Sequence, residues 1–486
     1  MLLRLSKSRY CSGLQCLRQL WWRSHEPAAP ELVVDDGLQA IFNQGHAVGL
    51  AAQERVPGGI LIDFPHHAYA EKIMATRSAI ESGAPAIYEA SVVAADTFVA
   101  VDILERVPEG WRLIEVKSTT QVKDQHIPDI AIQLHVLRES GLRVERAELM
   151  HLNRDCAFPH LDNLFIREDV TGRAEALLAG IPAEIEKQLH VLHGPIPEVA
   201  IGPHCTSPYE CPFMGRCWPS RPRHHISELY AIGSGWRQLE AQGYSTIDQL
   251  PGGLALRGEA ERQRRAVASG TIVVEPGLAD ALSALREPIA IIDFETLAPA
   301  IPIWEGAHPY DPIPAQFSAH VQDGRGGWTH HQWLADGPKD PRPKLVERLA
   351  IACEGAATIL AYNKSFESRC LSLIAAALPS LKQQTDSIVR RLEDPLPMLR
   401  KFVYHPDFGG SFSLKAVLPA LVPGLGYDDL EIAEGTAASR ALEQLMFDRD
   451  ALTPEQHAQS RAALLSYCER DTRAVVRLLE RLKELA

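Results

Sequence analysis

The stretch VAVDILERVPEGWRLIEVKS at residues 99–118 decides the fold of the first part of the chain. Apolar residues alternate through both of its halves, and the turn PEG separates them, so the stretch predicts a β-hairpin. Asp102 lies on the first predicted strand, and Glu115 and Lys117 lie on the second. Side chains two residues apart on a strand point to the same face, so Glu115 and Lys117 face together. Charges in so apolar a hairpin need partners, because burying an unpaired charge is costly.

A divalent cation would supply such a partner, because Mg²⁺ and Mn²⁺ prefer oxygen ligands. The spacing Asp102–x12–Glu115–x–Lys117 resembles the PD-(D/E)XK nuclease superfamily, in particular its RecB-like branch. The resemblance implies that Asp102 and Glu115 hold the metal and that Glu89, on the preceding strand, is a further acid beside it. It also implies catalytic roles for Lys117, which can orient water or stabilise charge on a phosphate, and for Gln133 on the helix that follows.

The sequence departs from the RecB-like pattern at one position. RecB-like nucleases usually carry a metal-binding histidine near the start of the domain, and here Gly49 occupies that place. His46 lies three residues earlier in the same segment.

Three cysteines stand close together in PHCTSPYECPFMGRCW, at Cys205, Cys211 and Cys217. Prolines between these cysteines exclude a regular helix or strand, so the segment is predicted to be a metal-binding loop. A sulfur ligand set suits zinc or an iron–sulfur cluster, and it requires a fourth ligand. The element QCLRQLWW around Cys16 resembles the one that opens the RecB-like and CRISPR-associated iron–sulfur nucleases, which implies a [4Fe–4S] cluster on these four residues. Cys11 is the competing fourth ligand, and zinc is the competing metal.

A second set of acids lies in the last part of the chain. In PIAIIDFET, Asp293 and Glu295 alternate on a hydrophobic strand, so both carboxylates point the same way. In AYNKSFES, a strand ends and Glu367 lies on the first turn of a helix. The long final helix, from about residue 454, carries Tyr467 and Asp471 four residues apart on one face.

These three motifs resemble those of the DnaQ-like 3′–5′ exonucleases, which have the RNase H-like fold. The resemblance implies that the carboxylates of Asp293, Glu295, Glu367 and Asp471 hold two metal ions about 4 Å apart and that Tyr467 positions the attacking water. Glu367 stands where the family usually has aspartate, which is one methylene shorter. Lys415, near a glycine-rich turn, is interpreted either as a phosphate contact or as a solvated lysine.

The chain has 486 residues, too many for one ordinary hydrophobic core, so two or three domains are expected. We expect an α/β protein with three parts: a RecB-like nuclease domain at 1–222, a helical segment at 223–285 and an RNase H-like domain at 286–486. The helical segment reads either as a helix-hairpin-helix-like grip on nucleic acid or as a plain linker. Both halves together resemble a bacterial family known as a domain of unknown function, and FVYHPDFGGSFSLKAVLPAL strengthens that match.

The formal net charge of −13 argues against a protein that coats nucleic acid indiscriminately. No apolar run reaches the roughly 18 residues that a membrane-spanning helix needs. The first residues are basic and lack the apolar core of a signal peptide, so we expect a cytoplasmic protein without a membrane partner.

The patterns together predict a metal-dependent nuclease that hydrolyses phosphodiester bonds, with DNA favoured over RNA as the partner and single-stranded ends as the expected point of attack. The alternative is a nucleic-acid-binding scaffold in which one or both sites are inactive and the cluster is structural. Gly49 and Glu367 are the features that favour the alternative.

Overall fold

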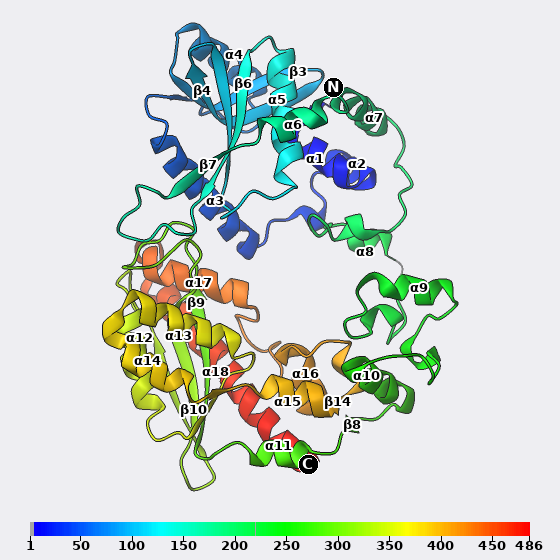
Figure 1. Ribbon diagram of the computed structural model, residues 1–486, viewed down its shortest axis with the longest axis vertical. Coiled ribbons are helices and arrows are strands. Elements are labelled where there is room, and N and C mark those ends of the chain that lie inside the picture. Colours follow the sequence, from blue (N-terminus) through cyan, green and yellow to red (C-terminus); the bar gives the residue numbers. More distant parts are fainter. Residues whose placement is uncertain (1–3, 219) are drawn as a thin grey trace. The chain divides into compact units, whose positions relative to one another are not determined.

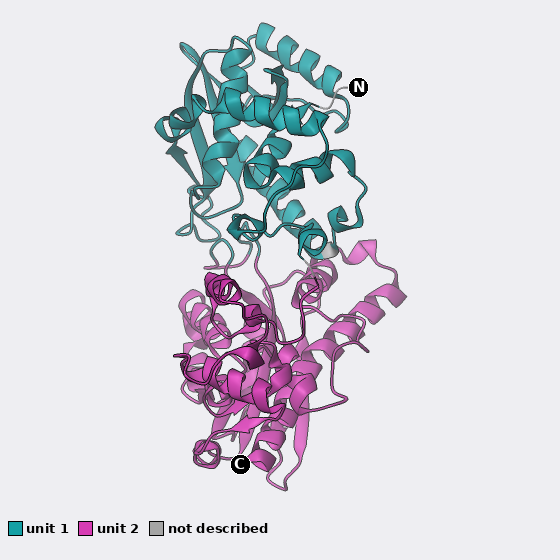
Figure 2. Cartoon of the chain, turned by 90° about the vertical axis from the view of Figure 1, so that its right-hand side faces the viewer, with its two compact units in different colours: residues 1–219, 299–303, 308–310 teal, residues 220–298, 304–307, 311–486 magenta. Residues whose placement is uncertain are grey.

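The computed structural model describes residues 4–218 and 220–486 of the chain. These residues form a mixed α/β structure that divides into two compact units, shown in different colours in Figure 2. Unit 1 contains Met1–Pro219, Pro299–Ile303 and His308–Tyr310; unit 2 contains Ser220–Ala298, Trp304–Ala307 and Asp311–Ala486. The segment that the sequence predicts as a separate helical part therefore belongs to unit 2. No helix among the described residues is long and apolar enough to cross a membrane.

Unit 1 is built on a mixed seven-stranded sheet in the order β2-β3-β4-β5-β6-β7, with β1 beside β4. The strands are β1 (Leu5–Ser6), β2 (Ile60–Leu61), β3 (Ala86–Ala94), β4 (Thr97–Val107), β5 (Gly110–Lys117), β6 (Val144–Leu152) and β7 (Phe165–Asp169). The predicted hairpin is the antiparallel pair β4–β5, while β5 and β6 run parallel. Parallel neighbours need a crossover connection, and the predicted helix supplies it as α5 (His126–Glu139).

The other helices of unit 1 surround this sheet and its N-terminal segment. They are α1 (Lys7–Gln15), α2 (Leu17–His25), α3 (Asp36–Glu54), α4 (Tyr69–Glu81), α6 (Thr171–Leu178), α7 (Ile181–His193) and α8 (Met214–Cys217).

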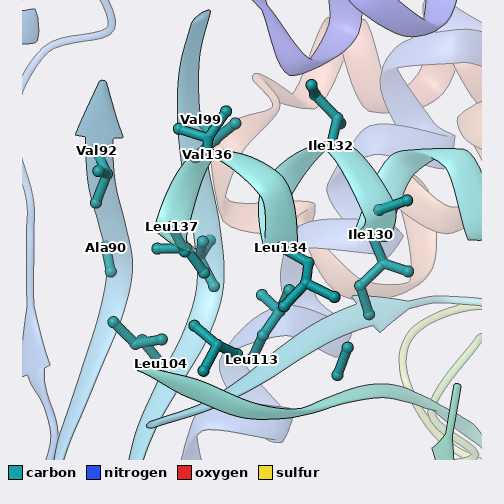
Figure 3. Close-up of a cluster of buried hydrophobic side chains, with 14 of the residues drawn as sticks. Ala90, Val92, Val99, Leu104, Leu113, Ile130, Ile132, Leu134, Val136 and Leu137 are labelled. Atoms are coloured by element: carbon teal, nitrogen blue, oxygen red, sulfur yellow. The ribbon is translucent and has the colours of Figure 1, made fainter. Parts of the chain in front are cut away.

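The packing of α5 on the sheet fixes which side chains of β5 face the helix. Figure 3 shows Leu134 and Leu137 of α5 above Leu104 of β4 and Leu113 of β5, all in one buried cluster. Since side chains alternate along a strand, Glu115, two residues after Leu113, points to the same side as α5. The apolar contacts of the hairpin thus place its charged residues under the crossover helix.

Unit 2 is built on a five-stranded sheet in the order β11-β10-β9-β12-β13. Strand β10 runs antiparallel to both β9 and β11, and β12 runs parallel to both β9 and β13. A separate pair joins β8 and β14. The strands of unit 2 are β8 (Val273–Val274), β9 (Ile289–Leu297), β10 (Ile313–Gln322), β11 (Trp328–Leu334), β12 (Thr358–Leu360), β13 (Leu392–Glu393) and β14 (Val403–Tyr404).

Helices cover both faces of the sheet of unit 2, as Figure 1 shows, with α12, α13 and α14 on one face and the long α18 on the other. The helices of the unit are α9 (Trp236–Ala241), α10 (Gly258–Ser269), α11 (Leu278–Ser283), α12 (Arg342–Ala352), α13 (Ser365–Ala377), α14 (Lys382–Val389), α15 (Pro395–Phe402), α16 (Leu414–Leu421), α17 (Gly435–Phe447) and α18 (Pro454–Leu485). The start of α18 is fixed by a capping box between Thr453 and Gln456.

Strand β9 is buried on both faces, and its alternation decides where its acids point. Ala290, Ile292 and Phe294 pack into the cluster that also contains residues of α12 and α13. Ile289 and Ile291 pack instead with residues of α18. Asp293 and Glu295 continue the second series, so their side chains lie on the face that α18 covers.

The strand that the sequence predicts to end at Asn363 is shorter in the structure. Strand β12 ends at Leu360, and Asn363 adopts a positive φ of 65° two residues before α13 begins. Asparagine tolerates this left-handed conformation better than most residues, so the chain turns there instead of continuing the strand.

Replacing Leu134 with alanine should lower the free energy of unfolding of unit 1 by roughly 2–5 kcal/mol, because Leu134 is fully buried between α5 and the sheet. Leu177→Ala is the matched control: Leu177 is 40% exposed on α6, so its loss should cost less than about 1 kcal/mol. Urea denaturation followed by circular dichroism measures both. Equal midpoints for the two variants would contradict the packing described here.

Candidate functional site

Glu115 is the centre of a buried group of charged and polar side chains in unit 1, and it is only 1% exposed. Its carboxylate accepts hydrogen bonds from Lys117 Nζ at 2.7 Å, from Lys7 Nζ at 3.0 Å and from Gln133 Nε2 at 2.7 Å. The structure therefore brings together Glu115, Lys117 and Gln133, which the sequence predicts as one site.

Two members of this group were not predicted. Asp129 Oδ2 accepts a hydrogen bond from Lys117 Nζ at 2.5 Å, and Lys7 Nζ lies 3.6 Å from Asp129 Oδ1. Asp129 precedes Gln133 by four residues on α5, and this spacing on one helix face could have indicated it. Lys7 gave no such signal, because it comes from α1, 108 residues before Glu115.

Asp102 lies beside this group on β4, where its Oδ2 accepts a hydrogen bond from the backbone N–H of Val116 at 2.7 Å. Burial, with the charge of Glu115 as the next cause, raises the pKa of Asp102 to about 7. Burial also opposes ionisation of Glu115, but Lys117 and Lys7 outweigh it and hold the pKa of Glu115 well below its usual range. Of the predicted metal ligands, Glu115 is thus ionised, and Asp102 ionises near neutral pH.

Glu89 lies on β3 with a positive φ of 57°, an uncommon backbone conformation for glutamate. Burial raises the pKa of Glu89, and the charges of Lys7, Glu115 and His46 all act on it. Glu89 and His46 therefore lie within electrostatic reach of the Glu115 group. Gly49 faces open space: a Cβ added there would meet no described atom within 4 Å outside its own helix backbone.

The four predicted cluster ligands, Cys16, Cys205, Cys211 and Cys217, line one pocket in unit 1. Burial raises the pKa of the Cys211 thiol, and the other three thiols raise it further. Cys11 lies elsewhere: burial raises its pKa to about 12, and Asp129, Lys7, Lys117 and Glu115 are the charges around it. The structure thus groups Cys16, and not Cys11, with the three cysteines of the loop.

The spacing of the four thiols bears on the group that they could hold. A single tetrahedral zinc ion with Zn–S bonds of about 2.3 Å brings its sulfurs to about 3.8 Å from one another. Within residues 4–218 and 220–486, no three of the four thiols have their Sγ atoms within 4.8 Å of one another. No three of these thiols are therefore as close together as the sulfurs around one bound zinc ion.

Two arginines lie beside these thiols. Arg18 lines the same pocket and lowers the pKa of Cys217 both by its charge and by a hydrogen bond, although burial is the larger effect and raises it. The charge of Cys211 likewise acts on Arg23. Positive charge next to the sulfurs would offset the negative charge of a thiolate-bound cluster.

Unit 2 contains a second group of acids, which comes from three separate elements. Asp293 and Glu295 lie on β9, Glu367 on α13 and Asp471 on α18. The charges of Asp471, Glu295 and Glu367 all raise the pKa of Asp293, after burial as the largest cause. The structure thus places Glu295, Glu367 and Asp471 within electrostatic reach of Asp293. Asp293, Glu295 and the unpredicted Cys468 have ligand atoms within 4.8 Å of one another.

The acids of unit 2 resist ionisation in the absence of a cation. Burial followed by the charge of Asp471 raises the pKa of Glu295 to about 8, and burial raises that of Glu367 to about 7 and that of Asp471 to about 6. Glu367 is only 4% exposed, and its Oε2 has no hydrogen-bond partner among the described residues. A buried oxygen without a partner is unfavourable, so Mg²⁺ or Mn²⁺, which favour oxygen ligands, fit this group of residues.

Two tyrosines and a lysine border Asp471. Tyr427 donates a hydrogen bond to Asp471 Oδ1, and its ring centroid lies 6.2 Å from that of Tyr467. The Nζ of Lys415 lies 5.2 Å from the ring centroid of Tyr427 and 5.8 Å from that of Tyr467, and it donates to the carbonyl of Ala433 at 2.6 Å. Lys415 is exposed and lowers the pKa of Glu295, so it is a positive charge at the edge of the acidic group. Tyr427 was not predicted, because nothing in its own stretch of sequence marks it.

A protein-family profile described as a domain of unknown function (DUF2779) matches residues 290–413 of the chain. The matched stretch contains Asp293, Glu295 and Glu367 and ends before Tyr467 and Asp471. No curated protein matches the chain.

The acids of unit 2 predict an unusual dependence of stability on pH. Their pKa values in the folded chain lie above the usual 3.8–4.5, up to about 8 for Glu295, so the folded state binds more protons than the unfolded state in this window. The free energy of unfolding contributed by these groups should therefore fall as pH rises from about 5 to about 8. Mn²⁺ added at about pH 8 should restore the free energy of unfolding, because an ion that binds only the folded state stabilises it.

Thermal denaturation of the metal-free protein over this pH range, with and without Mn²⁺, measures the effect. Asp293→Asn removes one of the repelling charges, so it should flatten the pH dependence and weaken the Mn²⁺ response. Asp280→Asn, on α11, is the control with an unchanged response. If the melting temperature of the wild type rises between about pH 5 and about pH 8 relative to that of Asp293→Asn, the acids of unit 2 do not destabilise the folded protein when they ionise.

Proposed function

We propose that the chain is a metal-dependent nuclease that hydrolyses phosphodiester bonds of single-stranded DNA ends, with one hydrolytic centre in each unit. The observation that carries the proposal is the acidic group of unit 2. Four carboxylates from β9, α13 and α18 share one buried region, their pKa values are raised, and one buried oxygen lacks a partner. In its ionised form such an arrangement is unfavourable unless cations bind there.

In unit 2 the proposed centre is of the DnaQ-like type on an RNase H-like fold. Bound Mg²⁺ or Mn²⁺ would activate water and stabilise the leaving oxygen. Asp293, Glu295, Glu367 and Asp471 would hold the ions, and Tyr467, 5% exposed beside Asp471, would position the water. The exposed Lys415 is suited to contact a phosphate of the substrate strand. The sheet order, with β9 central and acids on the α18 face, supports this assignment.

In unit 1 the proposed centre is of the RecB-like PD-(D/E)XK type. Asp102 and Glu115, with Glu89 nearby, would hold a divalent cation. Lys117 would orient the attacking water or meet the charge of the phosphate. Gln133 fixes the Glu115 carboxylate through its 2.7 Å hydrogen bond. The support is the convergence of these residues from two adjacent strands and the crossover helix.

For the cysteine group of unit 1 we propose a [4Fe–4S] cluster on Cys16, Cys205, Cys211 and Cys217. Cys16 lies between α1 and α2, while the other three cysteines lie about 190 to 200 residues later in the chain. A group bound by all four would join the two ends of unit 1. Arg18, whose charge acts on Cys217, would offset the negative charge of the thiolate ligands.

A nucleic-acid-binding scaffold is the second candidate, and one observation in unit 1 favours it. Both Lys7 and Lys117 already neutralise Glu115 and Asp129, and no histidine stands at position 49. Unit 1 would then bind nucleic acid without cutting it, while unit 2 carries the hydrolytic activity. For either candidate we propose a cytoplasmic location and DNA before RNA as the partner.

Cleavage of end-labelled single-stranded DNA and RNA by the full chain tests the two centres separately. Asp293→Asn should lower exonucleolytic release of nucleotides roughly 100-fold or more, because it removes a metal ligand and leaves the volume of the side chain unchanged. Lys117→Ala should lower a second, separable cleavage activity by a similar factor. Asp280→Asn and Lys187→Ala, at positions outside both centres, are the matched controls. Wild-type rates for both Asp293→Asn and Lys117→Ala on every substrate would overturn the proposed function.

The cluster has a test that does not depend on cleavage. Protein purified without oxygen should be brown and contain about four irons per chain if the group is [4Fe–4S]. Cys211→Ser should lose the colour and lower the melting temperature of unit 1, whereas Cys156→Ser, a buried cysteine of the same unit, should keep the colour. Stoichiometric zinc without iron in the wild type would exclude the iron–sulfur assignment.

A further inference from the structure

Cys468 is a buried thiol in the middle of the acidic group of unit 2, and the motifs of that group do not include it. It is 0% exposed and lies on α18 directly after Tyr467. Its Sγ lies 3.6 Å from Asp293 Oδ2 and 3.7 Å from the carbonyl oxygen of Asp293, although the two residues are 175 positions apart in the sequence. Sulfur and carboxylate oxygens thus face one another at the same point of the centre.

The separation between this sulfur and oxygen is the one expected of two ligands of the same ion. Metal–sulfur bonds of about 2.3 Å and metal–oxygen bonds of about 2.1 Å at a tetrahedral angle place the two ligand atoms about 3.6 Å apart. The Sγ–Oδ2 distance of Cys468 and Asp293 is 3.6 Å. Glu295 supplies a third ligand atom, since one atom of each of the three residues lies within 4.8 Å of the other two.

A second observation points to a cation at this place. The Oε2 of Glu367 is buried, has no hydrogen-bond partner among residues 4–218 and 220–486, and belongs to a side chain whose charge acts on Asp293. A protein interior leaves such an acceptor unsatisfied only rarely. An ion held by Asp293 would give this oxygen the positive charge that the protein itself does not provide.

We propose that Cys468 is a ligand of one cation in unit 2 and makes that position a mixed sulfur–oxygen site, which prefers ions such as Zn²⁺ or Co²⁺ over Mg²⁺. Thiolates favour softer ions, whereas Mg²⁺ is held by oxygen ligands. When the ion binds, the thiol proton leaves to solvent and one sulfur–metal bond forms, so no oxidant or reductant is needed. The inference rests on the proposed function, because it requires that the acidic group of unit 2 binds metal.

Titration of the full chain with Co²⁺ tests the proposal, with the iron–sulfur ligands of unit 1 already loaded so that their sulfurs do not compete. The wild type should develop a near-ultraviolet sulfur-to-cobalt charge-transfer band, seen as a difference spectrum against the protein before addition. Cys468→Ser should lose this band while it still binds Co²⁺ through the carboxylates. Cys353→Ser, at a buried cysteine directly after α12 in the same unit, should keep the band.

The outcomes separate this inference from the proposed function. Co²⁺ binding that Asp293→Asn weakens, but that gives no charge-transfer band, would overturn the role of Cys468 as a ligand. The metal centre would remain supported, and the thiol would be a hydrogen-bond donor to Asp293. No Co²⁺ binding sensitive to Asp293→Asn would overturn the metal centre itself. If Cys468→Ser does not fold, Asp293→Asn takes its place, because this variant keeps the Cys468 thiol. Loss of the charge-transfer band in Asp293→Asn would show that the sulfur and the carboxylate bind the same ion. An unchanged band would show that they do not.

Discussion

Carboxylates gathered in one buried group repel one another, and the two units meet that repulsion in different ways. In unit 1 the charge of Glu115 is met by the protein itself, through the ammonium groups of Lys117 and Lys7 at 2.7 and 3.0 Å. In unit 2 the charge of Lys415 acts on the acids, and this lysine is exposed at the edge of the acidic group. The two ammonium groups thus lower the pKa of Glu115, whereas in unit 2 burial and mutual repulsion raise the pKa values of the acids.

The local features of both units were predictable from the sequence, because they depend on alternation along single strands. The hairpin that places Glu115 beside Lys117 and the strand that orients Asp293 with Glu295 both follow from a period of two residues. The groups that could not be predicted are those brought in from distant segments. Lys7 comes from a helix 108 residues before Glu115, and Cys468 lies 175 residues after Asp293, so only the packing of whole helices on the sheets reveals them. The end of β12 was predicted too far along the chain, because Asn363 turns the chain in a stretch whose apolar pattern continues.

The N-terminal helices of unit 1 connect two of its features. Lys7 is the first residue of α1, and Cys16 lies between α1 and α2 as the cap of both helices. A side chain that pairs with Glu115 and a side chain that lines the cysteine pocket are thus held by one short helix. Any group bound at Cys16 would limit the freedom of α1, and with it the position of the Lys7 ammonium relative to the carboxylates.

Unit 1 is discontinuous in the chain, since Pro299–Ile303 and His308–Tyr310 belong to it although they follow β9 of unit 2. Ala300 is buried with Val48 and Leu152, and Tyr310 donates a hydrogen bond to the carbonyl of Ser118. A gene fragment that stops at Pro219 would encode unit 1 without a part of its own apolar interior. A recombination event that moved unit 1 to another protein would therefore have to carry Pro299–Ile303 and His308–Tyr310 as well as the N-terminal segment.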